Sequence, residues 1–114
     1  MKWISLLILL ASHGASADEA FRLELHDRKL VVRSPVKVGP QFSVIVENQS
    51  VSAVLGKFSS GEEDLRFVRV APASSQTVEF AVKSGAKVFF RPLAPAFQEV
   101  ELVAGKKTYE IPPQ

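Results

Sequence analysis

Phe21-Arg22-Leu23-Glu24-Leu25-His26 is the stretch of sequence that decides the fold. Apolar residues occupy every second position, and charged or polar residues occupy the positions between them. Successive side chains of a β-strand point to opposite faces, so this pattern predicts a strand with one face in a core and the other in solvent. We therefore expect the chain to build its core from β-sheets.

The same period of two recurs along the chain in short segments that are separated by turn residues. Val and Phe dominate the apolar residues of these segments, and both favour pleated, half-buried surfaces. No segment has the i, i+3, i+4 apolar spacing of a long helix. The pattern predicts an all-β protein, an antiparallel Greek-key β-sandwich of about seven to nine short strands. The predicted strands cover residues 21–26, 29–33, 42–47, 51–58, 65–70, 77–83, 86–91, 97–103 and 107–111.

Glycine and proline positions refine this prediction. Gly56 interrupts a strand and indicates a β-bulge. Ser84-Gly85 predicts a tight hairpin turn between the strands on either side, because Gly accepts a positive φ. Pro92 and Pro95 are expected to bracket a loop, since Pro cannot donate to a central ladder.

Residues 1–17 have the pattern of a secretory signal peptide. Lys2 precedes the apolar run Trp3–Ala11, and Ala15-Ser16-Ala17 is a small-x-small cleavage site. The apolar run, about nine residues, is much shorter than the roughly 20 that span a bilayer. We expect residues 18–114 to form one mature domain that is exported to the periplasm or the extracellular space, with no stable membrane insertion after cleavage.

Composition excludes several classes of function. The 114 residues contain no Cys, which rules out a disulfide framework, a thiolate zinc site, a cysteine nucleophile and the thiolate ligand of blue copper. The formal net charge is +2, from 14 basic and 12 acidic residues. Loss of Lys2 with the leader would leave 13 basic against 12 acidic residues, a net charge of +1. No nucleic-acid partner is therefore expected.

Candidate catalytic and metal-binding residues are few. His26 is the one His of the predicted mature chain, and its place on the polar face of a strand indicates a solvated side chain. We assign no catalytic residue and expect a protein that is not an enzyme. The acidic run Glu62, Glu63 and Asp64 offers oxygen ligands, although its spacing does not match an EF-hand loop. His26 and this run are the only candidate metal ligands.

Two further motifs have ordinary structural interpretations. Arg66 and Arg69 are three residues apart, so on a regular strand they face opposite sides and form no single basic patch. Asn48-Gln49-Ser50 matches the N-x-Ser acceptor pattern for glycosylation, and turn chemistry also explains Asn at this position. Whether Asn48 is glycosylated is left open by the sequence.

A set of stretches spread over nearly the whole predicted mature chain carries a resemblance to a known family. These stretches are Phe21–Leu30, Val38-Gly39, Phe42–Asn48, Phe58–Ser60, Val70–Val78, Gly85–Phe90 and Leu102-Val103. With them the chain resembles a small periplasmic cupredoxin-like domain, of the single-domain type encoded with bacterial iron or copper uptake systems. The resemblance implies a cupredoxin- or immunoglobulin-like sandwich and an envelope location.

The metal ligands that this resemblance would imply are not matched. Metal-bearing members carry ligands in the loop after the Phe-Phe strand, but here that loop, Arg91–Phe97, contains no Asp, Glu, Cys, His or Met. The resemblance therefore implies the fold without a redox copper site or other cofactor.

The function expected from these features is that of a binding or accessory module for another envelope or secreted protein. Arg91, Leu93 and Phe97 are the candidate contact residues, because an exposed apolar patch in this loop would mark a partner surface. The alternative is an accessory protein of an iron or copper uptake system that binds a cation through His26 and the Glu62–Asp64 loop. The oligomeric state and the identity of the partner are left open.

Overall fold

The structure is a computed structural model, which describes residues 20–38, 41–61, 63–83, 85–106 and 108–112. The predicted signal peptide lies outside the described residues, as do Glu62 and Ser84. Within the described part of the chain there is no helix, which confirms the all-β prediction. The strands are β1 (Ala20–Leu25), β2 (Leu30–Arg33), β3 (Phe42–Asn48), β4 (Val54–Ser60), β5 (Glu63–Val70), β6 (Ser74–Phe80), β7 (Phe89–Ala94), β8 (Val100–Glu101) and β9 (Tyr109–Ile111).

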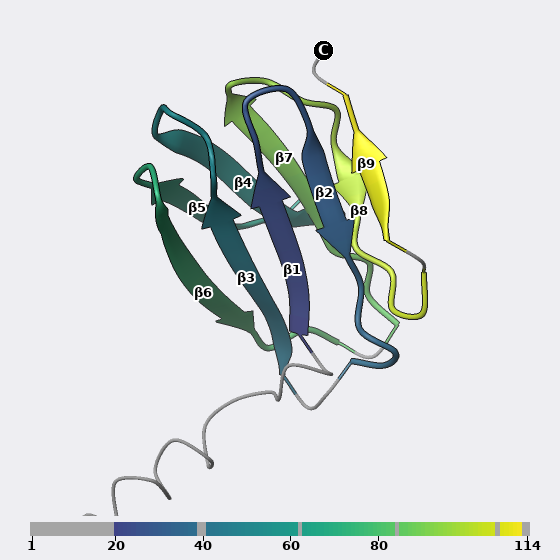
Figure 1. Ribbon diagram of the computed structural model, residues 1–114. Helices are drawn as coiled ribbons and strands as arrows, with labels where there is room; N and C mark the ends of the chain where they lie inside the picture. The colour runs from purple at the N-terminus through teal and green to yellow at the C-terminus, as the bar shows by residue number, and fades with distance from the viewer. Residues whose placement is uncertain (1–19, 39–40, 62, 84, 107, 113–114) are drawn as a thin grey trace, which may run out of the picture.

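The strands form two sheets that lie face to face (Figure 1). Sheet A has the strand order β6-β3-β1-β2-β9, and sheet B has the order β5-β4-β7-β8. Most neighbouring strands are antiparallel, but β1 and β3 run parallel. The chain changes sheet after β3, β5, β6 and β8, so each sheet is assembled from segments that are distant in sequence.

Between the sheets lies one hydrophobic core, supplied by alternate residues of the strands. In β1 the side chains of Phe21, Leu23 and Leu25 are fully buried, as the alternation predicted. Phe58 of β4 connects the two layers, because its ring lies 5.2 Å from that of Phe80 in sheet A and 4.7 Å from that of Phe90 in sheet B. Aromatic pairs at these centroid distances pack favourably.

Two predictions about connections have different outcomes. The first hairpin is confirmed: β1 pairs with β2, and the His26 N–H donates to the Lys29 carbonyl at 2.9 Å. The tight turn predicted across residues 84 and 85 is confirmed, since the Ala86 N–H donates to the Lys83 carbonyl at 2.9 Å and Gly85 has a positive φ. The hairpin that this turn was expected to make is wrong, because β6 ends at Phe80 in sheet A and β7 begins at Phe89 in sheet B. The connecting segment crosses between the sheets, with the fully buried Val88 in the core.

β7 continues through Pro92, where the sequence predicted the start of a loop. The carbonyl of Pro92 accepts a hydrogen bond from the Phe97 N–H at 3.4 Å, on the side away from β4. The N and O atoms of a strand residue point to the same edge, so the N–H that Pro lacks would not have bonded to β4. Pro92 therefore fits into β7 without breaking its pairing with β4.

A bulge is present where Gly56 indicated one, since the β4–β7 register shifts between Leu55 and Gly56, but the extra residue is Leu93 of the opposite strand, β7. Gly56 also allows a close contact that the sequence did not reveal. A Cβ atom at this position would lie 2.6 Å from two ring atoms of Phe90. The absence of a side chain thus lets the Phe90 ring pack directly against the backbone of β4.

We predict that Gly56→Ala lowers the free energy of unfolding by about 1–3 kcal/mol, the usual cost of overpacking a core. Urea unfolding of the mature chain measures this effect. Phe90→Leu replaces the opposing ring with a shorter side chain. The loss of unfolding free energy in the double variant should therefore be at least ~1 kcal/mol smaller than the sum of the losses in the two single variants. Strict additivity of the two substitutions would contradict this account of Gly56.

Candidate functional site

The outer face of sheet B carries a contiguous group of exposed apolar and basic side chains. Alternation along β4, β5 and β7 turns residues such as Val54, Phe58 and Phe90 into the core and their neighbours outward. We call the outward group the basic apolar face, and it consists of Leu55, Lys57, Phe67, Arg69, Arg91 and Leu93.

Strand register places these residues in two adjacent rows. In one row, Lys57 of β4 lies between Phe67 of β5 and Arg91 of β7. In the next row, Leu55 lies between Arg69 and the segment at Ala94, and Leu93 is the extra residue at the bulge. Directly opposite residues on antiparallel strands have Cβ atoms about 5 Å apart, so the rows form one surface.

Three apolar side chains of this face are substantially accessible to solvent. The exposed fraction is 61% for Phe67, 42% for Leu93 and 41% for Leu55. Single exposed apolar residues are ordinary on protein surfaces, but neighbouring ones that are framed by polar groups are typical of interaction sites.

The cations of the basic apolar face differ in their ion pairing. Lys57 Nζ lies 3.3 Å from Asp64 Oδ1, and Arg91 Nη2 lies 3.6 Å from Glu99 Oε1. Arg69 is exposed and forms no ion pair with any residue that the structure describes. Its guanidinium is therefore the cation of this face that is available to an incoming carboxylate.

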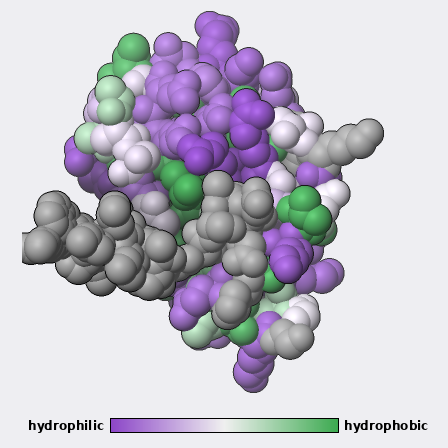
Figure 2. Space-filling view, turned by 60° about the horizontal axis from the view of Figure 1, so that its bottom comes forward, coloured by the Kyte–Doolittle hydropathy of each residue, from purple (hydrophilic) through white to green (hydrophobic). Residues whose placement is uncertain are grey.

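On the outer face of sheet A, in contrast, most charged side chains are paired with one another. Arg22 pairs with Glu47 across β1 and β3, and Arg33 Nε donates to Glu24 Oε2 at 2.7 Å. In Figure 2, which shows the lower end of the molecule with the sheet A side above it, hydrophilic residues predominate. Fewer charged groups of this face are therefore available to bind a charged partner.

The Arg33 guanidinium holds the pKa of Glu24 below its usual value of 4.5, mainly through their hydrogen bond. Partial burial opposes this shift, whereas the charge of Arg33 and the nearby His26 add to it. His26 Nε2 lies 3.6 Å from Glu24 Oε1. The structure thus gives His26 a carboxylate neighbour on the polar face where the sequence placed it.

Of the three predicted contact residues, Arg91 and Leu93 are exposed and belong to the basic apolar face. The expectation that Phe97 is exposed is wrong, because its side chain is only 2% accessible. The chain folds back after β7, where Leu93 bridges to Ala96, and this return turns the Phe97 ring into the core.

The structure does not bring His26 close to the described residues of the acidic loop, Glu63 and Asp64. His26 follows β1 at the end of the sandwich where β4 starts, because Leu25 pairs with Asn48 at the end of β3. Asp64 pairs with Ser59 near the other end of β4. At about 3.3 Å per residue, these ends are on the order of 20 Å apart. Among the described residues, no group of three or more His, Cys, Asp or Glu side chains is placed to hold a metal ion.

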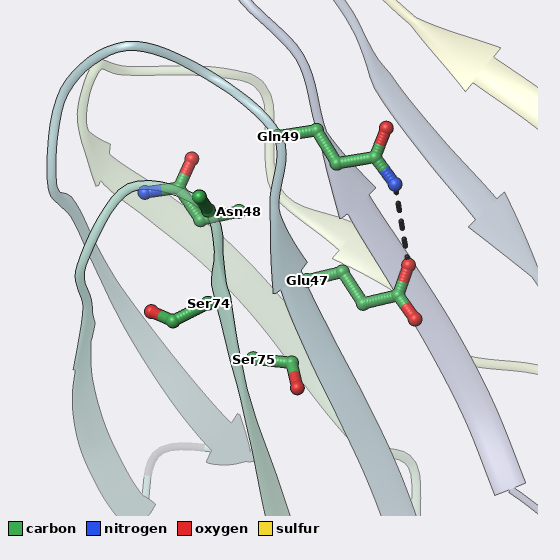
Figure 3. Close-up of a pocket in the computed structure, with 6 residues that line it drawn as sticks. Glu47, Asn48, Gln49, Ser74 and Ser75 are labelled. Carbon is green, nitrogen blue, oxygen red and sulfur yellow. Dashed lines mark hydrogen bonds between the residues drawn. The ribbon is translucent and has the colours of Figure 1, made fainter.

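Two shallow depressions lie at the end of the sandwich that carries Asn48. One, of about 440 Å³, is shown in Figure 3. The other, of about 460 Å³, adjoins Ala94 and Pro95, close to Leu93 of the basic apolar face. The first is lined by Glu47, Asn48, Gln49, Ala73, Ser74 and Ser75.

Asn48 is a structural residue whose side-chain amide is closed to modification in the folded protein. It is 1% exposed, and its Nδ2 donates at 2.8 Å both to the Ser52 carbonyl and to the Val70 carbonyl. Its Oδ1 accepts from the N–H and the hydroxyl of Ser50, at 2.9 and 2.6 Å. A glycan would replace one of the two Nδ2 hydrogens and so remove one of these donor bonds inside the protein. The N-x-Ser pattern is therefore explained by buried hydrogen bonding.

Sequence reasoning missed Leu55 and Phe67 because β4 and β5 are irregular. Their register shifts between Phe58 and Ser59, which leaves Leu65 as an extra residue. In β5, apolar residues occupy both odd positions (Leu65 and Phe67) and even positions (Val68 and Val70). Alternation alone therefore does not show which set faces the core. The expected separation of Arg66 and Arg69 is confirmed, since Arg66 is opposite the buried Phe58 and Arg69 is opposite Leu55.

We predict that Glu24→Gln makes stability less dependent on pH in acid. Because the folded pKa of Glu24 lies below its unfolded value, the unfolded chain takes up a proton first as the pH falls. The contribution of Glu24 is thus complete at pH 7 and is lost below about pH 4.5. Urea midpoints at pH 7 and pH 3 should differ less in Glu24→Gln and in Arg33→Gln than in the wild type. If the urea midpoint fell by the same amount between pH 7 and pH 3 in all three proteins, the lowered pKa of Glu24 would not be a source of the acid sensitivity.

No helix in the described part of the chain is long and apolar enough to cross a membrane. No protein-family model matches the sequence, and no curated protein is similar to it.

Proposed function

We propose that this protein is an exported, non-enzymatic binding module that contacts another envelope or secreted protein through the basic apolar face. The observation that supports this function best is the contiguity of Leu55, Phe67 and Leu93 beside Arg69, which has no ion pair among the described residues. Aromatic side chains and Arg are the residues that most often dominate binding energy at protein interfaces. The predicted signal peptide supports export to the periplasm or the extracellular space.

A protein partner fits this face better than a nucleic acid does. Asp64 and Glu99 lie among the cations at ion-pair distance, and they would repel a phosphate backbone. A partner patch with one carboxylate opposite Arg69 and apolar side chains around it would complement both the charge and the apolar area. We therefore assign the face to a protein of that chemistry.

We further propose that the scaffold is a Greek-key sandwich of the cupredoxin-like kind that serves without a redox copper. This form is supported by two sheets that share one core and by a chain that repeatedly changes sheet. The return segment after β7, Pro95-Ala96-Phe97, contributes one buried ring and no metal ligand. In this proposal the residues around β7 serve protein contact in place of metal binding.

The experiment compares two double variants that each replace two exposed apolar residues with Ser. Phe67→Ser/Leu93→Ser removes two of the three exposed apolar side chains of the face, whereas Val36→Ser/Val103→Ser alters residues outside the face that are 84% and 41% exposed. Tagged mature proteins are incubated with envelope extract of the native host, and the captured proteins are compared with those captured by the wild type. We expect capture to fall at least roughly tenfold for the first pair only, as for central interface residues.

Capture that is unchanged by Phe67→Ser/Leu93→Ser, or reduced equally by both pairs, would rule out the basic apolar face as the binding surface. For any protein that passes this test, Arg69→Glu should weaken the complex. The weakening should be larger at low than at high salt concentration, because exposed charges are screened by salt.

A further inference from the structure

The two sheets have four edge strands, and three of them are protected against pairing with another chain. β8 has two residues, and β9 has three and is followed by Pro112. β5 is long, but it has a bulge at Leu65 and a charged residue, Arg66, at an inward-facing position. Short edge strands, bulges and inward charges are the features by which natural proteins block edge-to-edge pairing.

β6, the outer strand of sheet A, has none of these features. It consists of seven residues, Ser74–Phe80, and contains no Pro, Gly, Lys or Arg. Its pairing with β3 runs from end to end without a register shift. Val78 and Phe80 are buried, whereas Ser75, Thr77 and Glu79 are exposed on the outer face. Such a strand presents a straight row of backbone N–H and C=O groups at its free edge.

We infer that β6 is a dimerisation site at which a second copy of this chain adds its own β6 in antiparallel orientation. The inference is independent of the function proposed for the basic apolar face, which belongs to the other sheet. A two-fold axis perpendicular to sheet A through Thr77 pairs all seven residues of each strand. The two sheets A then form one continuous sheet.

In this register each outward side chain of β6 lies opposite a compatible side chain of the second copy. Thr77 is opposite Thr77 of the second copy, and Thr–Thr pairs are favourable neighbours across strands. Ser75 is opposite Glu79 of the second copy, so a hydroxyl donor meets a carboxylate acceptor on each side of the axis. No like charges are directly opposite each other.

The surroundings of Ser75 fit this arrangement. Ser75 and Ser74 line the depression of about 440 Å³ at the start of β6, on the side of the strand where Glu47 and Gln49 lie (Figure 3). The depression is on the β3 side of β6, whereas Glu79 of the second copy would approach Ser75 from the free edge on the other side. The nearest carboxylate there, Glu47, is paired with Arg22, which limits repulsion between the two acids.

Pairing of one strand edge buries less surface than a permanent interface, so we expect a reversible dimer with a dissociation constant between about 10 μM and 1 mM. Sedimentation equilibrium of the mature protein over this concentration range measures it. Hydrogen exchange adds a local readout, since the amides of β6 should become more protected as the protein concentration rises.

Two variants with the same added charge test the register. Thr77→Lys places two introduced lysines directly opposite each other and should weaken the dimer roughly fivefold. Ser75→Lys places each introduced lysine opposite Glu79 of the second copy and should tighten the dimer severalfold. Both positions are exposed, and thermal unfolding verifies that each variant is folded.

A wild-type protein that stays monomeric at about 1 mM would overturn the inference. A dimer whose dissociation constant changes in the same direction in both variants, or in neither, would also overturn it. Loss of dimerisation without loss of envelope capture would leave the function proposed for the basic apolar face intact.

Discussion

The buried amide of Asn48 is the contact on which the arrangement of the two sheets depends. Asn48 ends β3 in sheet A, and its Nδ2 donates to the carbonyl of Val70, which ends β5 in sheet B. A second donor bond goes to Ser52 and two acceptor bonds come from Ser50, so all four hydrogen-bonding positions of the amide are used. A fully satisfied buried polar group of this kind fixes geometry that apolar packing alone leaves adjustable.

The same end of the sandwich is held by backbone bonds around Asn48. Its carbonyl accepts from the Ala73 N–H at 2.9 Å, and the neighbouring Gln49 N–H donates to the Leu25 carbonyl at 2.7 Å. The first bond lies just before β6 begins, and the second ties the end of β3 to the end of β1. With the side-chain bonds to Ser52 and Val70, they hold the end of β3 beside the end of β5, the start of β6 and the segment that leads into β4.

The sequence predicted the regular strands well, because their alternation is uninterrupted. β1 and β3 follow the predicted segments closely, and the β1–β2 hairpin is as expected. The prediction failed where the chain departs from a regular strand. The bulge in β5 hides which side of Phe67 faces solvent. Gly85 suits a hairpin and a crossover between sheets equally well, so the sequence does not distinguish the two.

The candidate site was predicted only in part, for the same physical reason. Arg91 and Leu93 were identified from their loop, but Phe97 was assigned to the surface although it completes the core. Leu55 enters the site only through cross-strand register, which one sequence does not contain. Asn48 shows the opposite kind of failure. A motif that is typical of exposed turns is buried here, because its side chain bonds to the turn that follows it and to the end of β5.

Hydrogen exchange of the Asn48 side-chain amide, followed by NMR in the mature protein, tests the central structural claim most directly. The exposed side-chain amide of the adjacent Gln49 provides an internal reference in the same sample. Slow exchange of both Asn48 Nδ2 protons, comparable with the most protected backbone amides of β3, is the result predicted. Exchange as fast as that of Gln49 would show that this amide does not hold the two sheets together.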